Sequence, residues 1–193
     1  MFANEESRFP EIVEKAIVEI QKIDGVRLRI AETGIGAGYL RIEVTEGDAC
    51  LKVDFVNDIA FRSGSPVEHD GIRIDTLSNI LTNKISALTG RDELKDIVDV
   101  REICRRSRFN WARVLEASSE KEASVDGEYI DYKLSSLIAF LKAHTGFLDS
   151  INWIIKPDAD IFISDLEEIR KDILSLSDNS IFSASAAVLE DLS

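Results

Sequence analysis

Apolar and polar residues alternate along three consecutive stretches between residues 26 and 58. These stretches read VRLRI, YLRIEV and LKVDFVND. Alternation with a period of two is typical of strands that bury one face. Glycine-rich or acidic turns at 34–38 and 46–48 separate the stretches, so the pattern predicts an antiparallel meander. The GIGAG turn is not followed by a helix, and we therefore interpret it as a hairpin connection and not as a phosphate-binding loop.

Helical periodicity replaces alternation on both sides of this meander. Upstream, apolar residues recur at helical spacing from Phe9 to Ile20, with Pro10 in the first turn, which predicts a helix packed on the sheet. Downstream, LSNILTNKISALTG and RDELKDIVDVREIC predict two helices, and further helical patterns follow. A capping box at 164–167 predicts the start of a late helix that ends near Leu176. Trp111 and Trp153 are expected to fill the core between these helices.

The order of these patterns predicts an α+β protein in two parts. Residues 1–75 are expected to form a small sheet domain, and residues 76–193 a helical domain. The predicted sheet has three strands. Its outer strand leaves unpaired backbone groups, which favour pairing with a second copy or with another polypeptide.

Two polar residues of the third predicted strand share one face. Lys52 and Asp54 alternate with Leu51, Val53 and Phe55, so an acid and a base lie side by side. This arrangement suits a catalytic site, but a half-exposed strand also commonly carries such residues on its wet face. The spacing alone leaves both interpretations open.

The two helices that follow the strand carry the remaining candidate residues. Lys84 lies within the apolar stripe of the first helix, where an ammonium group needs an anionic partner or must reach water along its stem. Asp96 and Asp99 are neighbours on the second helix, and two close carboxylates repel unless a cation lies near them. Lys84, Arg91 and Lys95 are near enough in sequence to supply that cation, either in a salt-bridge network or in a polar pocket.

The joint spacing of these residues resembles that of a known family. A KVD strand is followed by a lysine and, twelve residues later, by Asp-x-x-Asp with an arginine between them, and NILTNKISALTGRDELKDIVDV is the most specific part. This pattern resembles the AbiEii/AbiGii-type nucleotidyltransferase toxin family over roughly residues 40 to 105. The resemblance implies a truncated nucleotidyltransferase-like core, with a small antiparallel or mixed sheet and flanking helices, followed by a helical bundle.

The resemblance also implies roles for the candidate residues. Nucleotidyl transfer depends on positioning a nucleoside triphosphate and on neutralising its charge, largely with Mg²⁺ held by carboxylates. Asp54 matches the third catalytic carboxylate of the family and would contribute to an incomplete metal site. The implied catalytic groups are Asp54, Lys84 and Asp96, and the implied substrate-binding groups are Lys52, Arg91 and Asp99.

The chain departs from the family pattern at its beginning. Relatives carry a Gly-Ser motif followed by Asp-x-Asp on a strand, and this sequence has no such motif before its first helix. Its opening residues, MFANEESRFPEIVEKAI, resemble the segment that follows the Asp-x-Asp strand in relatives. A single aspartate cannot hold two metal ions, so we expect no tight binding of magnesium nucleotides by this chain alone.

Three functions are consistent with this pattern. The first is a nucleotidyltransferase-like protein that is incomplete and inactive alone. The second is an active enzyme that transfers a nucleoside monophosphate to a tRNA or protein acceptor, once a partner or upstream segment supplies Asp-x-Asp across the exposed sheet edge. The third is a non-catalytic interaction module, such as a decoy or partner of a complete relative, in which Lys84, Asp96 and Asp99 form a structural network; a homodimer or an antitoxin partner would then pair through the exposed sheet edge.

The composition of the chain limits which binding partners and which cellular compartment we expect. A net charge of −13 argues against general affinity for nucleic acids or anionic membranes, which requires clustered lysine and arginine. No apolar run approaches membrane-spanning length. Cys50 and Cys104 are isolated and only His69 and His144 are available, so zinc ligation and a disulfide framework are not expected. A reducing cytoplasm is therefore the expected compartment.

Overall fold

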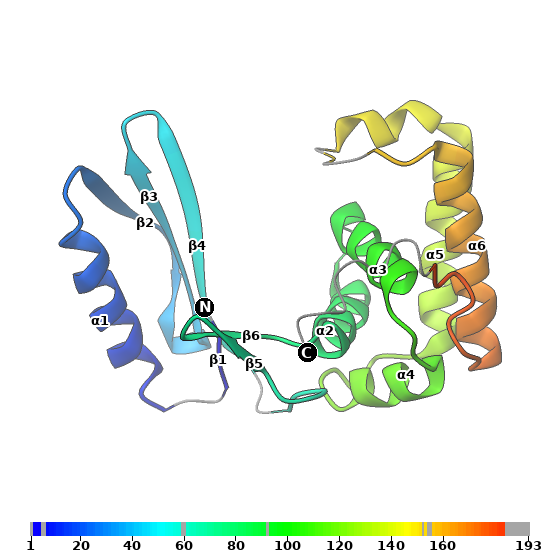
Figure 1. Ribbon diagram of the computed structural model, residues 1–193, viewed down its shortest axis with the longest axis horizontal. Coiled ribbons are helices and arrows are strands. Elements are labelled where there is room, and N and C mark those ends of the chain that lie inside the picture. The colour runs from blue at the N-terminus through cyan, green and yellow to red at the C-terminus, as the bar shows by residue number, and fades with distance from the viewer. Residues whose placement is uncertain are drawn as a thin grey trace. The chain divides into compact units, whose positions relative to one another are not determined.

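The chain folds into two compact units of different character (Figure 1). The computed structural model describes residues 2–4, 7–58, 61–91, 93–151, 153 and 156–183. One unit comprises residues 1–61 and the other residues 62–193, so the division lies earlier than the expected boundary after residue 75. Sheet dominates the first unit and helices the second, which confirms the α+β class.

The first unit is a mixed sheet with a helix on one face. Its described elements are β1 (Phe2–Asn4), α1 (Phe9–Gln21), β2 (Val26–Gly34), the 3₁₀ turn η1 (Ile35–Ala37), β3 (Tyr39–Glu46) and β4 (Ala49–Asp58). Strands β2, β3 and β4 form the predicted antiparallel meander, and β1 pairs in parallel with the end of β4, giving the order β1-β4-β3-β2. The alternation of apolar and polar residues therefore did predict the sheet.

One face of this sheet forms a small core with α1. In the register of β3 and β4, Leu40 lies opposite Phe55, and Ile42 lies opposite Val53. Leu40, Ile42 and Phe55 are buried together with residues on the inner face of α1. Because neighbouring strand residues point to opposite faces, the polar residues between them, including Asp54, lie on the other face of the sheet.

The second unit begins with a small hairpin and continues as a helical bundle. Its described elements are β5 (Val67–His69), β6 (Ile72–Ile74), α2 (Leu77–Gly90), α3 (Leu94–Arg106), α4 (Trp111–Ser119), α5 (Gly127–Ala143), the 3₁₀ turn η2 (Thr145–Ser150) and α6 (Ala159–Ser175). Thr76 caps α2, since its Oγ1 accepts a hydrogen bond from the backbone N–H of Asn79 at 3.1 Å.

The predicted start of α6 is wrong. The helix begins at Ala159, because the carboxylate of Asp158 accepts hydrogen bonds from the backbone N–H groups of Asp160 and Ile161 at 2.9 and 3.1 Å. Residues 164–167, which were expected to form a capping box, therefore lie inside α6. The predicted end of this helix near Leu176 is correct.

The core of the second unit lies between its helices. Trp111 is fully buried in it, and Trp153 packs edge-on against Phe162 with ring centroids 5.9 Å apart, so both tryptophans contribute to the core as expected. An ion pair is buried alongside, because the Arg101 guanidinium lies 2.7 Å from the carboxylate of Asp165. In the part of the chain described, none of the helices combines the length and apolar character that a membrane crossing requires.

Candidate functional site

The carboxylate of Asp54 is held by an arginine on the neighbouring strand. The register of β3 and β4 places Arg41 directly opposite Asp54. Arg41 Nε donates to Asp54 Oδ1 at 2.7 Å, and Arg41 Nη2 donates to Asp54 Oδ2 at 2.9 Å. Both carboxylate oxygens of Asp54 thus accept from one guanidinium, in the bidentate geometry that makes such pairs strong and directional.

This pair shifts the titration of the groups around it. The hydrogen bonds from Arg41 lower the pKa of Asp54, and the same contact raises the pKa of Arg41. The Tyr39 hydroxyl donates to Asp54 Oδ1 at 3.5 Å, and burial, followed by the charge of Asp54, raises the pKa of Tyr39. Asp54 therefore stays ionised well below neutral pH, which makes it a poor general base.

Lys52 lies on the same face of β4 as Asp54, as the alternation predicted. It faces Glu43 across the β3–β4 ladder. Glu43 accepts a hydrogen bond from Arg29 of β2 at 2.6 Å, so charges of both signs extend across three strands of this polar face. The arrangement is typical of the solvated side of a half-buried sheet.

Lys84 contacts both carboxylates that the sequence analysis singled out. Its Nζ lies 2.9 Å from Asp96 Oδ1 and 2.6 Å from Asp99 Oδ2. The Lys84 side chain is 24% exposed, Asp99 is 48% exposed, and the Asp96 side chain is fully buried. We expected Lys84 to lie within salt-bridge reach of Asp54 or of Asp96, and the contact with Asp96 confirms this.

Arg91 completes the cluster around the buried carboxylate. Its Nε donates to Asp96 Oδ2 at 2.8 Å, and its Nη2 donates to Asp96 Oδ1 at 3.2 Å. Burial by itself would raise the pKa of Asp96, but the hydrogen bonds from Arg91 and Lys84 outweigh it and lower that pKa. Burial likewise opposes the charge of Lys84, yet hydrogen bonds to Asp99 and Asp96 raise its pKa.

The charges of this cluster balance, which indicates a structural role. Two cations, Lys84 and Arg91, meet two carboxylates, Asp96 and Asp99. Lys84 belongs to α2, Arg91 follows the end of α2, and both carboxylates lie on α3. The cluster therefore clamps the turn between two helices, and every oxygen of the buried Asp96 already has a cationic donor.

The residues present do not fit the magnesium site that the family resemblance implies. A metal ion needs several oxygen ligands, and the positive charge of the Arg41 guanidinium, which lies against both oxygens of Asp54, opposes a second cation there. Among the described residues, no group of three or more His, Cys, Asp or Glu side chains has the arrangement of a metal site.

The six candidate residues fall into two groups that belong to different units. Lys52 and Asp54 lie in the first unit, and the four members of the helical cluster lie in the second. The residues of the helical cluster lie together as expected, and within its own unit Asp54 pairs with Arg41.

Arg41 and Tyr39 are the site residues that the sequence analysis missed. A signal was available, because both alternate onto the polar face of β3. Counting outward from the tight turn at 46–48 aligns Arg41 with Asp54. Two alternating strands joined by a short turn therefore contained enough information to pair these residues.

Comparisons with known proteins add no relative. No family model matches the chain, no curated protein matches it, and no solved structure matches it.

Proposed function

We propose that this chain is a nucleotidyltransferase-like protein, related to AbiEii-type toxins, that does not transfer nucleotides by itself. The observation that carries this proposal is the engagement of both Asp54 oxygens by Arg41. In-line transfer of a nucleoside monophosphate from a triphosphate to an acceptor, with pyrophosphate leaving, requires carboxylates that hold divalent ions, and Asp54 is the sole family-type metal ligand that the motif pattern offers. Its carboxylate is instead neutralised within the sheet.

The retained residues of the helical motif support the same proposal. Lys84, Arg91, Asp96 and Asp99 have the spacing of the family and meet in one cluster. Their charges are satisfied by one another, so the cluster stabilises the α2–α3 turn without any nucleotide.

A second candidate function is an active transferase that another polypeptide completes. It is favoured by the outer edge of β4, where the described residues of β1 pair only with Val56–Asp58. A strand added along the rest of this edge would run beside Asp54 and could bring an Asp-x-Asp pair to it. The same edge would serve a homodimer or an antitoxin partner if the protein is an interaction module.

Calorimetry with magnesium nucleotides tests the proposal. We expect none of the four ribonucleoside triphosphates to show micromolar, magnesium-dependent binding to the chain alone. Asp54→Ala serves as the matched variant, because it removes the one family-type metal ligand and leaves the helical cluster untouched. Magnesium-dependent binding that disappears in Asp54→Ala would overturn the proposal and favour an enzyme.

A further inference from the structure

The outer face of α5 carries aromatic and small side chains and no charge. The buried residues of this helix, from Ile130 to Leu141, pack into the core of the second unit. A helical turn of 3.6 residues places a second set of residues on the side away from that core. These residues, all of them exposed, are Tyr129, Tyr132, Ser136, Ala139, Phe140 and Ala143, and we call them the α5 stripe.

The aromatic rings of the α5 stripe are open to solvent. Tyr132 is 65% exposed, and Tyr129 and Phe140 are each 40% exposed. The two tyrosine rings stack on one another with centroids 6.5 Å apart. Phe140 packs edge-on against Phe147 of η2 at 4.9 Å, and Phe147 is exposed as well, so the apolar surface continues past the end of the helix. A continuous exposed patch of this kind marks an interaction surface.

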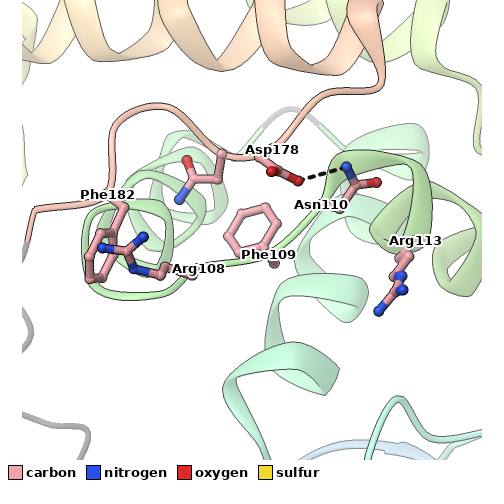
Figure 2. A pocket seen from close by; sticks show the side chains of 7 residues that line it. Arg108, Phe109, Asn110, Arg113, Asp178 and Phe182 are labelled. Carbon is pink, nitrogen blue, oxygen red and sulfur yellow. Dashed lines mark hydrogen bonds between the residues drawn. The ribbon is translucent and has the colours of Figure 1, made fainter.

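Other exposed parts of the second unit are more polar than the α5 stripe. On α6, which is also 17 residues long, the exposed Leu174 lies one turn from Lys171, whose Nζ pairs with Glu168 Oε1 at 2.6 Å. The open depression lined by residues 108–113 and 178–182 has arginine and aspartate side chains beside its two phenylalanines (Figure 2). An uncharged outer face is therefore a local feature of α5.

The area of this patch suits a stable protein–protein interface. The exposed fractions of Tyr129, Tyr132, Phe140 and Phe147 leave on the order of 400 Å² of side-chain surface on each copy. This is about half of the roughly 800 Å² that each partner buries in a standard interface, before the small residues of the stripe are counted. Charged residues, including Glu128 and Lys133, flank the stripe and supply the polar rim that such interfaces have.

The α5 stripe is complementary to itself. Both of its tyrosines precede Ser136, and both of its alanines follow that residue. A two-fold axis that pairs two α5 helices in antiparallel orientation therefore places the tyrosine rings of each copy over the alanines of the other. Each copy has a net charge of −13, so two copies repel in general, and an uncharged stripe lets them meet without placing like charges in contact.

We propose that two copies of this chain form a dimer through the α5 stripe. The two helices run antiparallel and cross near Ser136 and Ala139, where small side chains allow a close approach. The tyrosine rings at the crossing lose their exposure to water and supply most of the binding free energy. This interface uses no residue of β4 and none of the helical cluster, so it does not depend on the proposed function.

Sedimentation equilibrium of the full chain tests the dimer. We expect the wild type to be mainly dimeric at about 50 μM, and Tyr132→Glu to weaken dimerisation about a hundredfold, because a symmetric interface contains each substitution twice. Tyr132→Phe keeps the ring and should dimerise like the wild type. Leu174→Glu, on the outer face of α6, is the matched control and should change nothing. Added salt should tighten the dimer, because it screens the repulsion between two acidic copies.

Cross-linking tests the orientation of the two helices. In a Cys50→Ser background, which leaves only the buried Cys104, a short bifunctional maleimide should join two copies of Ser136→Cys and should not join copies of Ser164→Cys on α6. Asp54→Ala should leave dimerisation unchanged, which separates this interface from the proposed function.

Three outcomes would overturn the proposed dimer. A chain that is monomeric at about 200 μM would assign the stripe to a different protein. A Tyr132→Glu variant with the circular dichroism spectrum of the wild type that still dimerises like the wild type would remove the stripe from the interface. A dimer in which Ser136→Cys fails to cross-link would place the contact elsewhere, such as at the β4 edge.

Discussion

The two units hold their candidate carboxylates in opposite environments. Asp54 lies on the wet face of a sheet, where Arg41 and Tyr39 share it with solvent. Asp96 is fully buried between two helices, and its hydrogen bonds come from Lys84 and Arg91. An exposed ion pair contributes little to stability, whereas a buried carboxylate that loses its partners is strongly destabilising. Matched substitutions in the two units should therefore differ sharply in their effect on folding.

The largest expected effect is that of Asp96→Asn. The neutral amide keeps the size of the side chain but leaves Lys84 and Arg91 without their shared counter-ion. We expect a loss of about 3 kcal/mol of unfolding free energy, toward the lower end for broken buried pairs because both cations keep contact with water. Urea unfolding followed by circular dichroism measures it. The matched control is Asp99→Asn, which removes an exposed carboxylate from the same lysine and should cost much less.

Removing the lysine tests the same cluster from the other side. Lys84→Met keeps an apolar stem within the stripe of α2 but deprives Asp96 of one of its two cationic donors. Arg91 still holds the carboxylate, so the expected loss is about 1–2 kcal/mol in the same urea assay. A variant as stable as the wild type would show that the ammonium of Lys84 serves a ligand and not the fold.

The pH dependence of stability sharpens the comparison further. The pKa of Asp96 is lowered in the folded state. The ionised carboxylate therefore stabilises the fold fully at any pH above its ordinary pKa of about 4. This stabilisation is lost as the pH falls from there toward the lower pKa of the folded state. The difference in urea midpoint between the wild type and Asp96→Asn should therefore be constant from pH 7 to about pH 5 and shrink below about pH 4. A difference that grows on acidification would contradict the lowered pKa.

The smallest expected effect is that of Asp54→Asn in the sheet unit. Solvent screens the pair of Asp54 with Arg41, so its loss should shift the urea midpoint less than either helical substitution. Arg41→Gln provides the reciprocal measurement. A loss as large as that of Asp96→Asn would erase the contrast between the two units and would require a buried role for Asp54.

The elements of both units follow from local patterns in the sequence. Alternation predicted the meander, and helical spacing predicted α1, α2 and α3, because these periods are those of the strand and helix backbones. The predicted start of α6 was wrong, because the sequence holds two possible N-caps, the box at 164–167 and Asp158, and Asp158 is the one that caps the helix. The N-cap is the residue whose side chain accepts hydrogen bonds from the free N–H groups of the first turn. Two candidates in one stretch cannot be ranked from sequence alone.

By itself, the sequence determined the contacts that short connections enforce. Lys84, Arg91 and Asp96 meet because one tight turn joins their helices, and Arg41 meets Asp54 because a two-residue turn sets the strand register. Only the tertiary structure brought residues 108–113 beside residues 178–182 and let Asn179 donate a hydrogen bond to the carbonyl of Cys104. Such contacts depend on which helix packs against which over tens of residues, and that choice is made by the shape of the whole core, which no local period encodes.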